Sequence, residues 1–404
     1  MTRRFTTSEI GVVFVIFVGM SFGLAVIGPV LGELQAEFNV SLATLGLVLA
    51  TPSAARVAAT LPSGILADRL PARIPLSAGT LLLALGAFVC AITPNYAVLL
   101  VGLLIVGFST ALLFTAGMGH AVRITTARAR SKVIGKIMAG GQLGGFLAPI
   151  TAGVTANAFG WRAVFWLAAM IGLIATAVVW TTIRTERPTR ESRQTRSWHP
   201  SQLGLNRGVG AVVVFTILLW GATYSVKQVV LPLYGSVGLA LDPATIGIVL
   251  SVSGAIRTVV MFASGSILDR FGRGIVLVFA SSLGAVAVLL ITLSPTISIY
   301  LLIAILYSLG GITTALPPVL VAERTRPETL GRALGSMQLL VDLALFWLPL
   351  LLGLILDERG FGTVGTTLAI LYVAAMPVGL WIMRVRPQAA SHADSTARTP
   401  TTHR

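Results

Sequence analysis

The stretch SAARVAATLPSGILADR, residues 53–69, places Arg56 in an apolar run twelve residues before an Asp-Arg pair. The stretch SGAIRTVVMFASGSILDR, residues 253–270, places Arg257 at the same distance before a second Asp-Arg pair. With a shift of 201 residues, the segment 44–69 and its counterpart share ten identities in 26 positions. The chain therefore contains an internal repeat, and we predict that its two halves have the same fold.

The composition is typical of a membrane protein. Of the 404 residues, 55% are hydrophobic and only 11% are charged, whereas soluble proteins have about 25% charged residues. Apolar runs of roughly 20 residues, long enough to cross a ~30 Å hydrocarbon core as a helix, recur along the chain. We therefore predict an all-α membrane protein with twelve transmembrane helices. The predicted helices are residues 10–32, 42–66, 74–93, 96–120, 133–157, 161–183, 209–234, 243–267, 274–294, 297–321, 332–356 and 363–384.

The positive charge follows the predicted topology. The net charge is +15, and 24 of the 29 lysine and arginine residues share one face if the N-terminus is cytoplasmic. Only two lie on the opposite face, while Arg56, Lys227 and Arg257 lie inside helices. Because cytoplasmic loops are rich in Lys and Arg, we predict cytoplasmic termini in the plasma (inner) membrane. The basic excess is then topological, with some affinity for anionic lipid headgroups, and does not indicate nucleic-acid binding.

The sequence has no pattern for a metal, a cofactor or a nucleotide. The single cysteine, Cys90, excludes an intramolecular disulfide, and the four histidines lack metal-ligand spacing. The chain has no Gly-x-x-x-x-Gly-Lys-Ser/Thr loop, so ATP is not the expected direct energy source. Since no nucleophile and base occur together at depth, we predict a protein that is not an enzyme and that uses no cofactor.

Two polar segments divide the chain into its predicted parts. Residues 184–208 are predicted to be a cytoplasmic linker between an N-terminal six-helix bundle, 1–183, and a C-terminal one, 209–386. The polar tail, 387–404, is predicted to be disordered. Parallel repeats joined in this way are typical of secondary transporters, which bind substrate between the repeats near the midplane. We expect a monomer in which two pseudo-symmetric bundles rock around a central cavity.

Three motifs identify a family resemblance. The loop after the second predicted helix reads GILADRLPAR (64–73), and the loop after the eighth reads GSILDRFGRG (265–274). The sixth predicted helix opens with GWRAVFW (160–166). These motifs resemble those of the major facilitator superfamily, whose loop pattern is Gly-x-x-x-Asp-Arg-x-Gly-Arg-Arg/Lys, and the resemblance covers about residues 8–386. It implies a transporter of the two-bundle kind.

The resemblance also implies a gating role for the two loops. Their gating residues here are Gly64, Asp68, Arg69, Arg73, Gly265, Asp269, Arg270 and Arg273. In the outward-open state Asp68 is expected to face the cytoplasmic start of helix 11, whose N-terminal dipole favours a carboxylate. The loop glycine is expected to allow close helix approach. Pro71 and Ala72 depart from the family pattern and weaken this latch. The alternative is that the loops only orient the protein by their charge.

Features of the drug:proton antiporters of that family are only partly present. GGQLGGFLAPITAG, residues 140–153, resembles their helix-5 signature, but an Ala-Pro pair stands where Gly-Pro is usual. Leu103 occupies the place of their helix-4 arginine. Small residues at helical spacing are also explained by packing between helices.

Arg56 and Arg257 are predicted to lie near the membrane midplane and to face the interior. Twelve residues of helix rise about 18 Å, and half of the hydrocarbon core is about 15 Å. A guanidinium that faces lipid at this depth costs at least ~2.5–3.5 kcal/mol. With Lys227 as a third cation and Asp342 as the only carboxylate at comparable depth, the cavity has a predicted excess of about two positive charges.

This excess predicts a site for an anionic solute, because the guanidinium fork suits carboxylate, phosphate and other oxyanions. The predicted substrate-binding residues are Arg56, Arg257, Lys227, Gln142, Gln338 and Tyr224. The two glutamines occupy equivalent repeat positions. Further aromatic and amide residues that could complete the site are Phe22, Trp220, Gln228, Tyr307 and Trp347. The alternatives are structural pairing of the cations within the protein and a purely conformational role.

Asp342 is the predicted coupling residue. It lies ten residues, about 15 Å, into the eleventh predicted helix, close to the depth of Arg56. The resemblance implies that helices 2 and 11 touch between the halves, so Asp342 is expected to face Arg56 when they approach and to lose it when they part. The carboxylate would then take up or release a proton. The alternative is a static ion pair.

The sequence therefore predicts a secondary active transporter of a small organic solute, anionic in character, that works by alternating access. The main alternative is a proton-coupled multidrug efflux antiporter for lipophilic or cationic compounds. The positive cavity and the missing helix-4 arginine count against it. A further alternative is a non-transporting membrane receptor. The expected partners are the solute, membrane lipid and protons.

Overall fold

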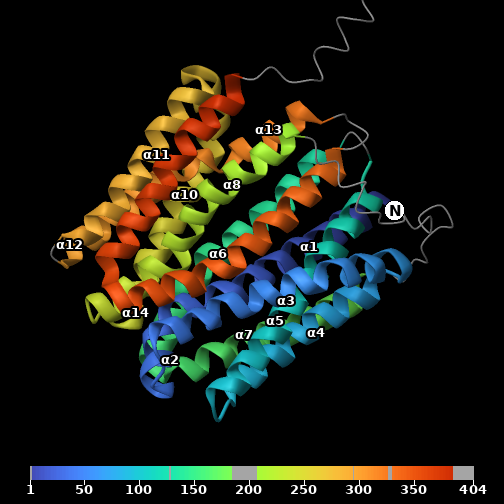
Figure 1. Cartoon of the computed structure of the whole chain (residues 1–404). Coiled ribbons are helices and arrows are strands. Elements are labelled where there is room, and N and C mark those ends of the chain that lie inside the picture. The colour runs from blue at the N-terminus through green and yellow to red at the C-terminus, as the bar shows by residue number, and fades with distance from the viewer. Residues whose placement is uncertain (1, 127–128, 184–206, 294, 326–329, 385–404) are drawn as a thin grey trace, which may run out of the picture.

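A computed structural model describes residues 2–126, 129–183, 207–293, 295–325 and 330–384 of the chain. These residues form a bundle of long helices with no strand among them (Figure 1). Most of the predicted linker and the whole predicted tail lie outside the described residues. The prediction of an all-α architecture is confirmed.

The helices of the first half are α1 (Thr2–Ala25), α2 (Ile27–Phe38), α3 (Leu42–Arg69), α4 (Arg73–Ala91), α5 (Tyr96–Arg123), α6 (Arg130–Phe159) and α7 (Trp161–Thr182). Those of the second half are α8 (Arg207–Ser225), η3 (Val226–Val230), α9 (Leu231–Leu233), η4 (Tyr234–Gly238), α10 (Pro243–Phe271), α11 (Arg273–Leu289), η5 (Leu290–Thr292), α12 (Ile297–Leu309), η6 (Gly310–Ala315), α13 (Leu316–Arg324) and α14 (Leu330–Arg384).

The number of membrane crossings depends on whether α14 is counted as one crossing or as two. Within the described residues, 11 helices are long and apolar enough to cross a membrane, and the last of them has 49 residues. A helix of that length is roughly 70 Å long, more than twice the ~30 Å hydrocarbon core. Gly360 interrupts it with a non-helical φ of 72°. We therefore count α14 as two crossings, which is consistent with the twelve predicted helices.

The internal repeat is visible in the helix caps. The Ser41 side chain accepts a hydrogen bond from the Thr44 N–H at 3.1 Å and starts α3. Asp242 does the same for α10 through the Thr245 N–H at 2.9 Å. These two pairs are related by the same shift of 201 residues that aligns the sequences, and α5 and α12 also have equivalent caps. The end of the bundle at which α3 and α10 begin is called the capped end below.

The two halves meet through two equivalent helix pairs, α3 with α14 and α6 with α10. A Cβ atom at Gly46 would lie 2.8 Å from the carbonyl oxygen of Pro349, and one at Gly247 would lie 2.2 Å from that of Pro149. Only glycine fits where a carbonyl comes this close. In one contact the glycine belongs to the first half and the carbonyl to the second, and in the other contact the roles are reversed. A pseudo-twofold axis between the halves relates contacts in this way. The exact boundaries of the two bundles and of their linker stay a prediction.

The halves are closed at the capped end. The Asp357 carboxylate of α14 accepts hydrogen bonds from the N–H groups of Leu42 and Ala43, at 2.9 and 2.8 Å. These groups are the first donors of α3, so one half caps a helix of the other. The opposite end, which carries the loops after α3 and α10, is called the loop end.

The loop end differs from what the sequence predicts for its glycines. A Cβ atom at Gly64 or Gly265 would meet no atom within 4 Å. The prediction of close helix approach at these two glycines is therefore wrong for this conformation. The physical reason is that the short contacts between the two halves lie toward the capped end, where Gly46 and Gly247 meet carbonyl groups of the other half.

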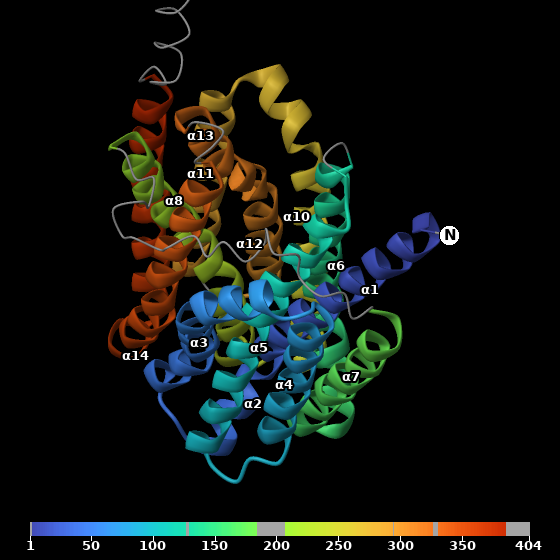
Figure 2. The same ribbon diagram turned by 90° about the vertical axis from the view of Figure 1, so that its right-hand side faces the viewer.

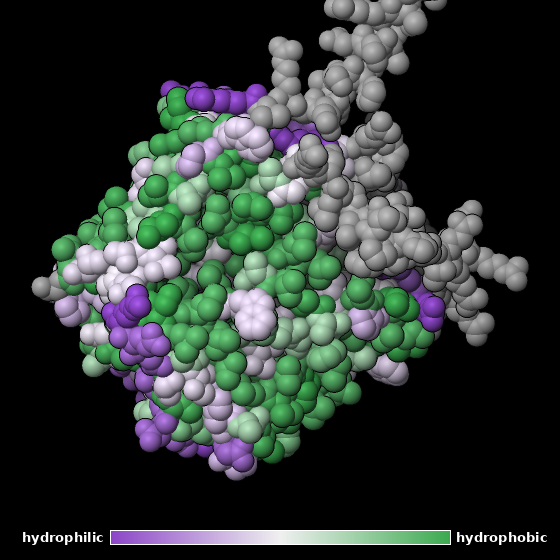
Figure 3. Space-filling view, viewed as in Figure 1, coloured by the Kyte–Doolittle hydropathy of each residue, from purple (hydrophilic) through white to green (hydrophobic). Residues whose placement is uncertain are grey.

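The surface has the polarity of a membrane protein. In the space-filling view an apolar band crosses the middle of the molecule, and hydrophilic residues gather toward its ends (Figure 3). Large apolar side chains of the second half, such as Phe262, Ile275 and Phe279, are exposed. Exposed apolar area of this extent indicates contact with lipid.

Candidate functional site

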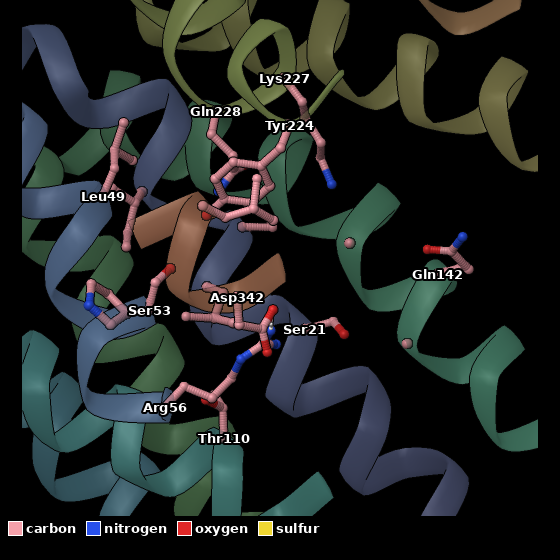
Figure 4. A pocket seen from close by; sticks show the side chains of 17 residues that line it. Ser21, Leu49, Ser53, Arg56, Thr110, Gln142, Tyr224, Lys227, Gln228 and Asp342 are labelled. Carbon is pink, nitrogen blue, oxygen red and sulfur yellow. Dashed lines mark hydrogen bonds and ion pairs between the residues drawn. The ribbon is translucent and has the colours of Figure 1, made fainter. Parts of the chain in front are cut away.

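A cavity of about 220 Å³ lies between the two halves. In Figure 2, α1, α3 and α6 lie on the side of the first half that faces the second half. The cavity is lined by Ser21, Leu24, Ala25, Ile27, Leu49, Pro52, Ser53, Arg56, Thr110, Gly141, Gln142, Gly145, Tyr224, Lys227, Gln228, Asp342 and Leu345 (Figure 4). The structure thus brings together four of the six predicted substrate-binding residues and the predicted coupling residue.

The first long helix of each half is interrupted where it lines this cavity. In the first half α1 ends at Ala25 and α2 begins at Ile27, and Pro29 has no N–H for the Ala25 carbonyl. In the second half Pro232 likewise cannot donate to the carbonyl of residue 228, and η3 is a π-helical segment in which the Leu231 N–H reaches the Val226 carbonyl. Interrupted helices at corresponding positions mark the substrate site in transporters of this architecture. Pro29 and Pro232 are therefore a signal that the sequence analysis did not use.

Arg56 and Asp342 form an ion pair across the cavity, with Arg56 Nη2 at 2.5 Å from Asp342 Oδ1. Arg56 comes from α3 and Asp342 from α14, so the pair links the two halves (Figure 4). The Gln338 amide donates to the same oxygen at 2.9 Å. The Asp342 side chain is only 12% exposed, whereas that of Arg56 is 37% exposed. The pair is therefore covered on the carboxylate side and open on the guanidinium side.

Lys227 lies in the π-helical segment η3 and lines the same cavity. Its amine forms no ion pair and no hydrogen bond within the described residues. Its Nζ extends toward α6 and passes Gly145, where a Cβ atom would lie 4.0 Å away (Figure 4). Tyr224, near the end of α8, and Gln228, in η3, flank it, and Gln142 lines the facing part of α6. Among the described residues, Lys227 thus lines the cavity without a carboxylate partner.

Arg257 does not line the cavity, although it occupies the repeat position of Arg56. Its Nη2 donates to the Thr314 hydroxyl at 2.7 Å, and its guanidinium lies over the Tyr307 ring at 5.2 Å from the centroid. A Cβ atom at Gly311 would lie 2.8 Å from Arg257 Cγ, so the glycine makes room for the side chain. The sequence predicts an excess of two positive charges in the cavity. The lining residues include two cations, Arg56 and Lys227, and one anion, Asp342, so the excess among them is one positive charge.

The other predicted residues are divided between the cavity and its surroundings. Gln142 donates through Nε2 to Met261 Sδ at 3.4 Å, across the α6–α10 interface. Gln338 lies behind Asp342 and does not line the cavity. Trp347 is 52% exposed and is not a lining residue. Sequence analysis missed the lining hydroxyls of Ser21, Ser53 and Thr110, because Ser and Thr recur along these helices without any distinguishing pattern.

The predicted gating residues include two Asp-Arg pairs, one near the end of α3 and one near the end of α10. Asp68, Arg69, Asp269 and Arg270 are all exposed at the loop end. Within the described residues, neither aspartate has a hydrogen bond or an ion pair.

The arginines that follow these loops are differently engaged. Arg73 lies over the Trp180 ring at 4.0 Å from the centroid, and Arg273 pairs with Glu323. Residues 326–329, which precede the eleventh predicted helix, lie outside the described residues, so the latch of Asp68 stays a prediction.

Among the described residues, no group of three or more His, Cys, Asp or Glu side chains could hold a metal ion.

Twelve membrane crossings in two repeated halves, with a polar cavity between them, are the architecture of a membrane transporter. The chain belongs to the Major Facilitator Superfamily, since the model of this family matches residues 13–313 and 228–402.

The fold is also that of solved transporters. A bacterial homologue of the human lysosomal transporter Spinster, solved in an inward-facing and unoccupied conformation, superposes with a TM-score of 0.80 at 15% identity. The match covers 94% of this chain and 97% of that one.

Curated relatives are transporters with different names. The putative uncharacterized transporter YgaY of Escherichia coli K12 is 28% identical over 43% of this chain, and the match spans only 45% of that relative. The gentisate transporter of Corynebacterium glutamicum is 26% identical over 82% of this chain and 77% of its own length. Multidrug resistance protein 2 of Bacillus subtilis is 24% identical over 69% of this chain and 74% of its own length.

Proposed function

We propose that this protein is a secondary active transporter of a small organic anion. The observation that carries the proposal is the Lys227 amine, which lines the central cavity without a carboxylate partner among the described residues. Arg56 lies across the same cavity with its guanidinium partly open to it. A carboxylate placed between them would balance the excess charge through charge-assisted hydrogen bonds.

The size of the cavity supports a small solute. Its volume of about 220 Å³ lies below the roughly 300–1,000 Å³ of pockets for drug-sized ligands. The lining combines a few polar groups with apolar walls from Leu24, Ile27, Leu49 and Leu345. Such a lining suits a compact molecule with one charged end and one apolar end.

A small aromatic carboxylate is the first candidate. Gentisate, the solute in the name of the Corynebacterium glutamicum relative, is an aromatic carboxylate. Tyr224 lines the cavity three residues before Lys227, so its ring could pack against an aromatic solute whose carboxylate contacts the amine. We place the protein in the plasma (inner) membrane with the loop end in the cytoplasm, because the basic residues gather at that end.

The second candidate is efflux of lipophilic or cationic drugs by proton antiport. The Bacillus subtilis relative, a multidrug resistance protein, is the observation that favours it. The uncompensated Lys227 opposes it, because a cationic drug would meet a like charge in a site of low dielectric.

Transport by the purified protein in liposomes separates these two functions. Vesicles preloaded with unlabelled benzoate or gentisate are expected to take up the labelled acid by counterflow. Excess aromatic acid should compete, and the lipophilic cation tetraphenylphosphonium should not. If the cation is transported and the acids neither compete nor exchange, the anion proposal is wrong and the efflux proposal is supported.

Alternating access predicts a specific effect of Gly247→Leu. In this conformation Gly247 lets α10 approach the Pro149 carbonyl at the capped end. A leucine there would meet backbone, and overpacking of about 1–3 kcal/mol would shift the equilibrium ~5–150-fold toward opening of the capped end. Spin labels at positions 159 and 237, one on each half at the capped end, should lie farther apart in Gly247→Leu than in the parent protein. The native cysteine, Cys90, is first replaced by alanine.

The matched control is Gly254→Ala on the same helix. Its Cβ would lie 3.7 Å from Phe146, which is an ordinary contact, so its distance distribution should equal that of the parent protein. Unchanged distances in Gly247→Leu would show that the capped end does not open at the α6–α10 interface.

A further inference from the structure

We propose that the solute of the central cavity is a hydroxylated aromatic monocarboxylate whose hydroxyl group donates a hydrogen bond to Asp342 Oδ2. This inference rests on the proposed function, because it takes the carboxylate of the solute to contact Lys227. It adds one hydrogen-bond donor to the apolar part of that solute. The observations that carry it are the polar groups of the cavity lining that no other protein group engages.

Asp342 presents one carboxylate oxygen that is not used by the protein. Its Oδ1 accepts from Arg56 Nη2 at 2.5 Å and from Gln338 Nε2 at 2.9 Å. Its Oδ2 has no hydrogen-bond partner within the described residues, yet this oxygen is not fully buried. Since Asp342 lines the central cavity, Oδ2 is an acceptor that a solute can reach there.

Two serine hydroxyls accompany this acceptor. Ser21 of α1 and Ser53 of α3 line the same cavity. Neither hydroxyl is fully buried, and neither has a partner within the part of the chain that the structure describes. Ser53 lies three residues before Arg56, so the two side chains share a face of α3. A hydroxyl group on the solute could therefore donate to Asp342 and accept from a serine, because a hydroxyl does both.

The hydroxyl of Thr110 differs from these two. It also lines the cavity, but it donates to the Gly107 carbonyl of its own helix at 2.8 Å. Its donor is therefore already used, and the free polar groups on this side of the cavity are Asp342 Oδ2 and the two serine hydroxyls.

The free acceptor and the free cation lie on different sides of the cavity. Figure 4 shows Lys227 and Gln228 toward one side, and Asp342 and Arg56 toward the other. The apolar walls of the lining would contact the faces of a ring between them. A ring with a carboxylate on one edge and a hydroxyl on another edge would engage both sides at once.

The charges of the lining favour a hydroxyl over an amine or a second carboxylate. Arg56 already neutralises Asp342, so Lys227 leaves one positive charge, which a monocarboxylate balances. A zwitterion would leave that charge unbalanced, and a dicarboxylate would bring a second anion beside Asp342, where like charges repel at low dielectric. A hydroxyl satisfies the Oδ2 acceptor without changing the balance of charge.

Competition against the counterflow of labelled benzoate in liposomes tests this inference. The better of 3-hydroxybenzoate and 4-hydroxybenzoate should compete at least about tenfold more strongly than benzoate, which is the contribution of a hydrogen bond to a charged group. The corresponding methoxybenzoate, which has the oxygen but no donor, should compete no better than benzoate. The same holds for 2-hydroxybenzoate, whose hydroxyl donates to its own carboxylate. 3-(Aminomethyl)benzoate and isophthalate should compete more weakly than the hydroxybenzoate.

Asp342→Leu removes the acceptor and tests its identity. The ratio of the half-maximal concentrations of the methoxybenzoate and the hydroxybenzoate should fall from about ten or more in the parent to about one. Because it is a ratio within one variant, a general change in anion binding cancels. The matched control is Glu358→Leu, which replaces an exposed carboxylate of the same helix at the capped end and should keep the parent ratio.

The possible failures are distinguishable. If the parent prefers neither hydroxybenzoate over benzoate and over its methoxy analogue, the hydroxyl assignment is wrong while anion transport stands, and this series decides the question even where Asp342→Leu does not fold. An unchanged ratio in a folded Asp342→Leu also overturns the assignment. If no aromatic acid exchanges or competes at all, the proposed function itself fails, and this inference fails with it.

Discussion

Lys227→Gln is expected to weaken binding of the transported anion by roughly 10–150-fold. The amine lines the central cavity without an ion pair among the described residues, so it is free to bind the solute. A hydrogen bond to a charged group contributes about 1.5–3 kcal/mol, and each 1.4 kcal/mol is tenfold in affinity. The effect should appear as a higher concentration for half-maximal counterflow of the aromatic acid. Lys227→Arg, which keeps the charge, should retain most of the affinity.

The control for this prediction is Lys132→Gln, the same change at an exposed position on α6. It should leave the affinity unchanged. Comparable melting temperatures of the two variants would exclude misfolding as the cause of any loss. If Lys227→Gln binds the acid as tightly as the parent does, Lys227 is not the anion-binding residue.

The depth of the charged residues was predictable from the sequence. Helical rise and the length of a membrane span place Arg56 and Asp342 at similar depths, and the structure pairs these two side chains. The repeat made a second prediction, that Arg257 faces the cavity as Arg56 does. The structure places Arg257 outside the cavity lining.

Local packing explains why the two arginines differ. The residue that packs near Arg257 is Gly311, and a shift of 201 residues relates it to Thr110 in the first half. The missing side chain at Gly311 lets the Arg257 stem lie against η6 and reach Thr314. Thr110 occupies the corresponding place beside Arg56 (Figure 4), so Arg56 extends into the cavity. A repeat fixes the depth of a residue, whereas the direction of its side chain depends on neighbours that the repeat does not conserve.

The direction of the Lys227 side chain also could not be predicted from the helical periodicity of the sequence. A regular helix turns about 100° per residue, but the π-helical segment η3 changes the phase of the residues that follow. Its cause, the missing N–H of Pro232, is visible in the sequence. The direction in which the helix accommodates that loss depends on the packing of η3 against α3 and α14, which only the folded chain supplies.

Asp342→Asn is expected to abolish proton-driven accumulation of the solute while leaving counterflow exchange intact. Asp342 links α14 to α3 through Arg56 at 2.5 Å and receives a hydrogen bond from Gln338. We propose that rocking of the halves separates this pair. Beside the guanidinium the carboxylate is stable as an anion, and once the guanidinium withdraws, a buried carboxylate takes up a proton. Asparagine keeps the hydrogen bonds of the side chain but has no titratable group, so exchange continues without coupling.

The measurement compares two assays of the same liposomes. With an imposed proton gradient, the parent should concentrate the labelled acid, and Asp342→Asn should reach only the ratio set by simple equilibration. Its counterflow rate should stay within a few-fold of the parent rate. Glu358→Gln, which removes an exposed carboxylate from the same helix at the capped end, should accumulate solute as the parent does. If Asp342→Asn still concentrates the acid with an unchanged pH dependence, the ion pair is static and another group couples transport to protons.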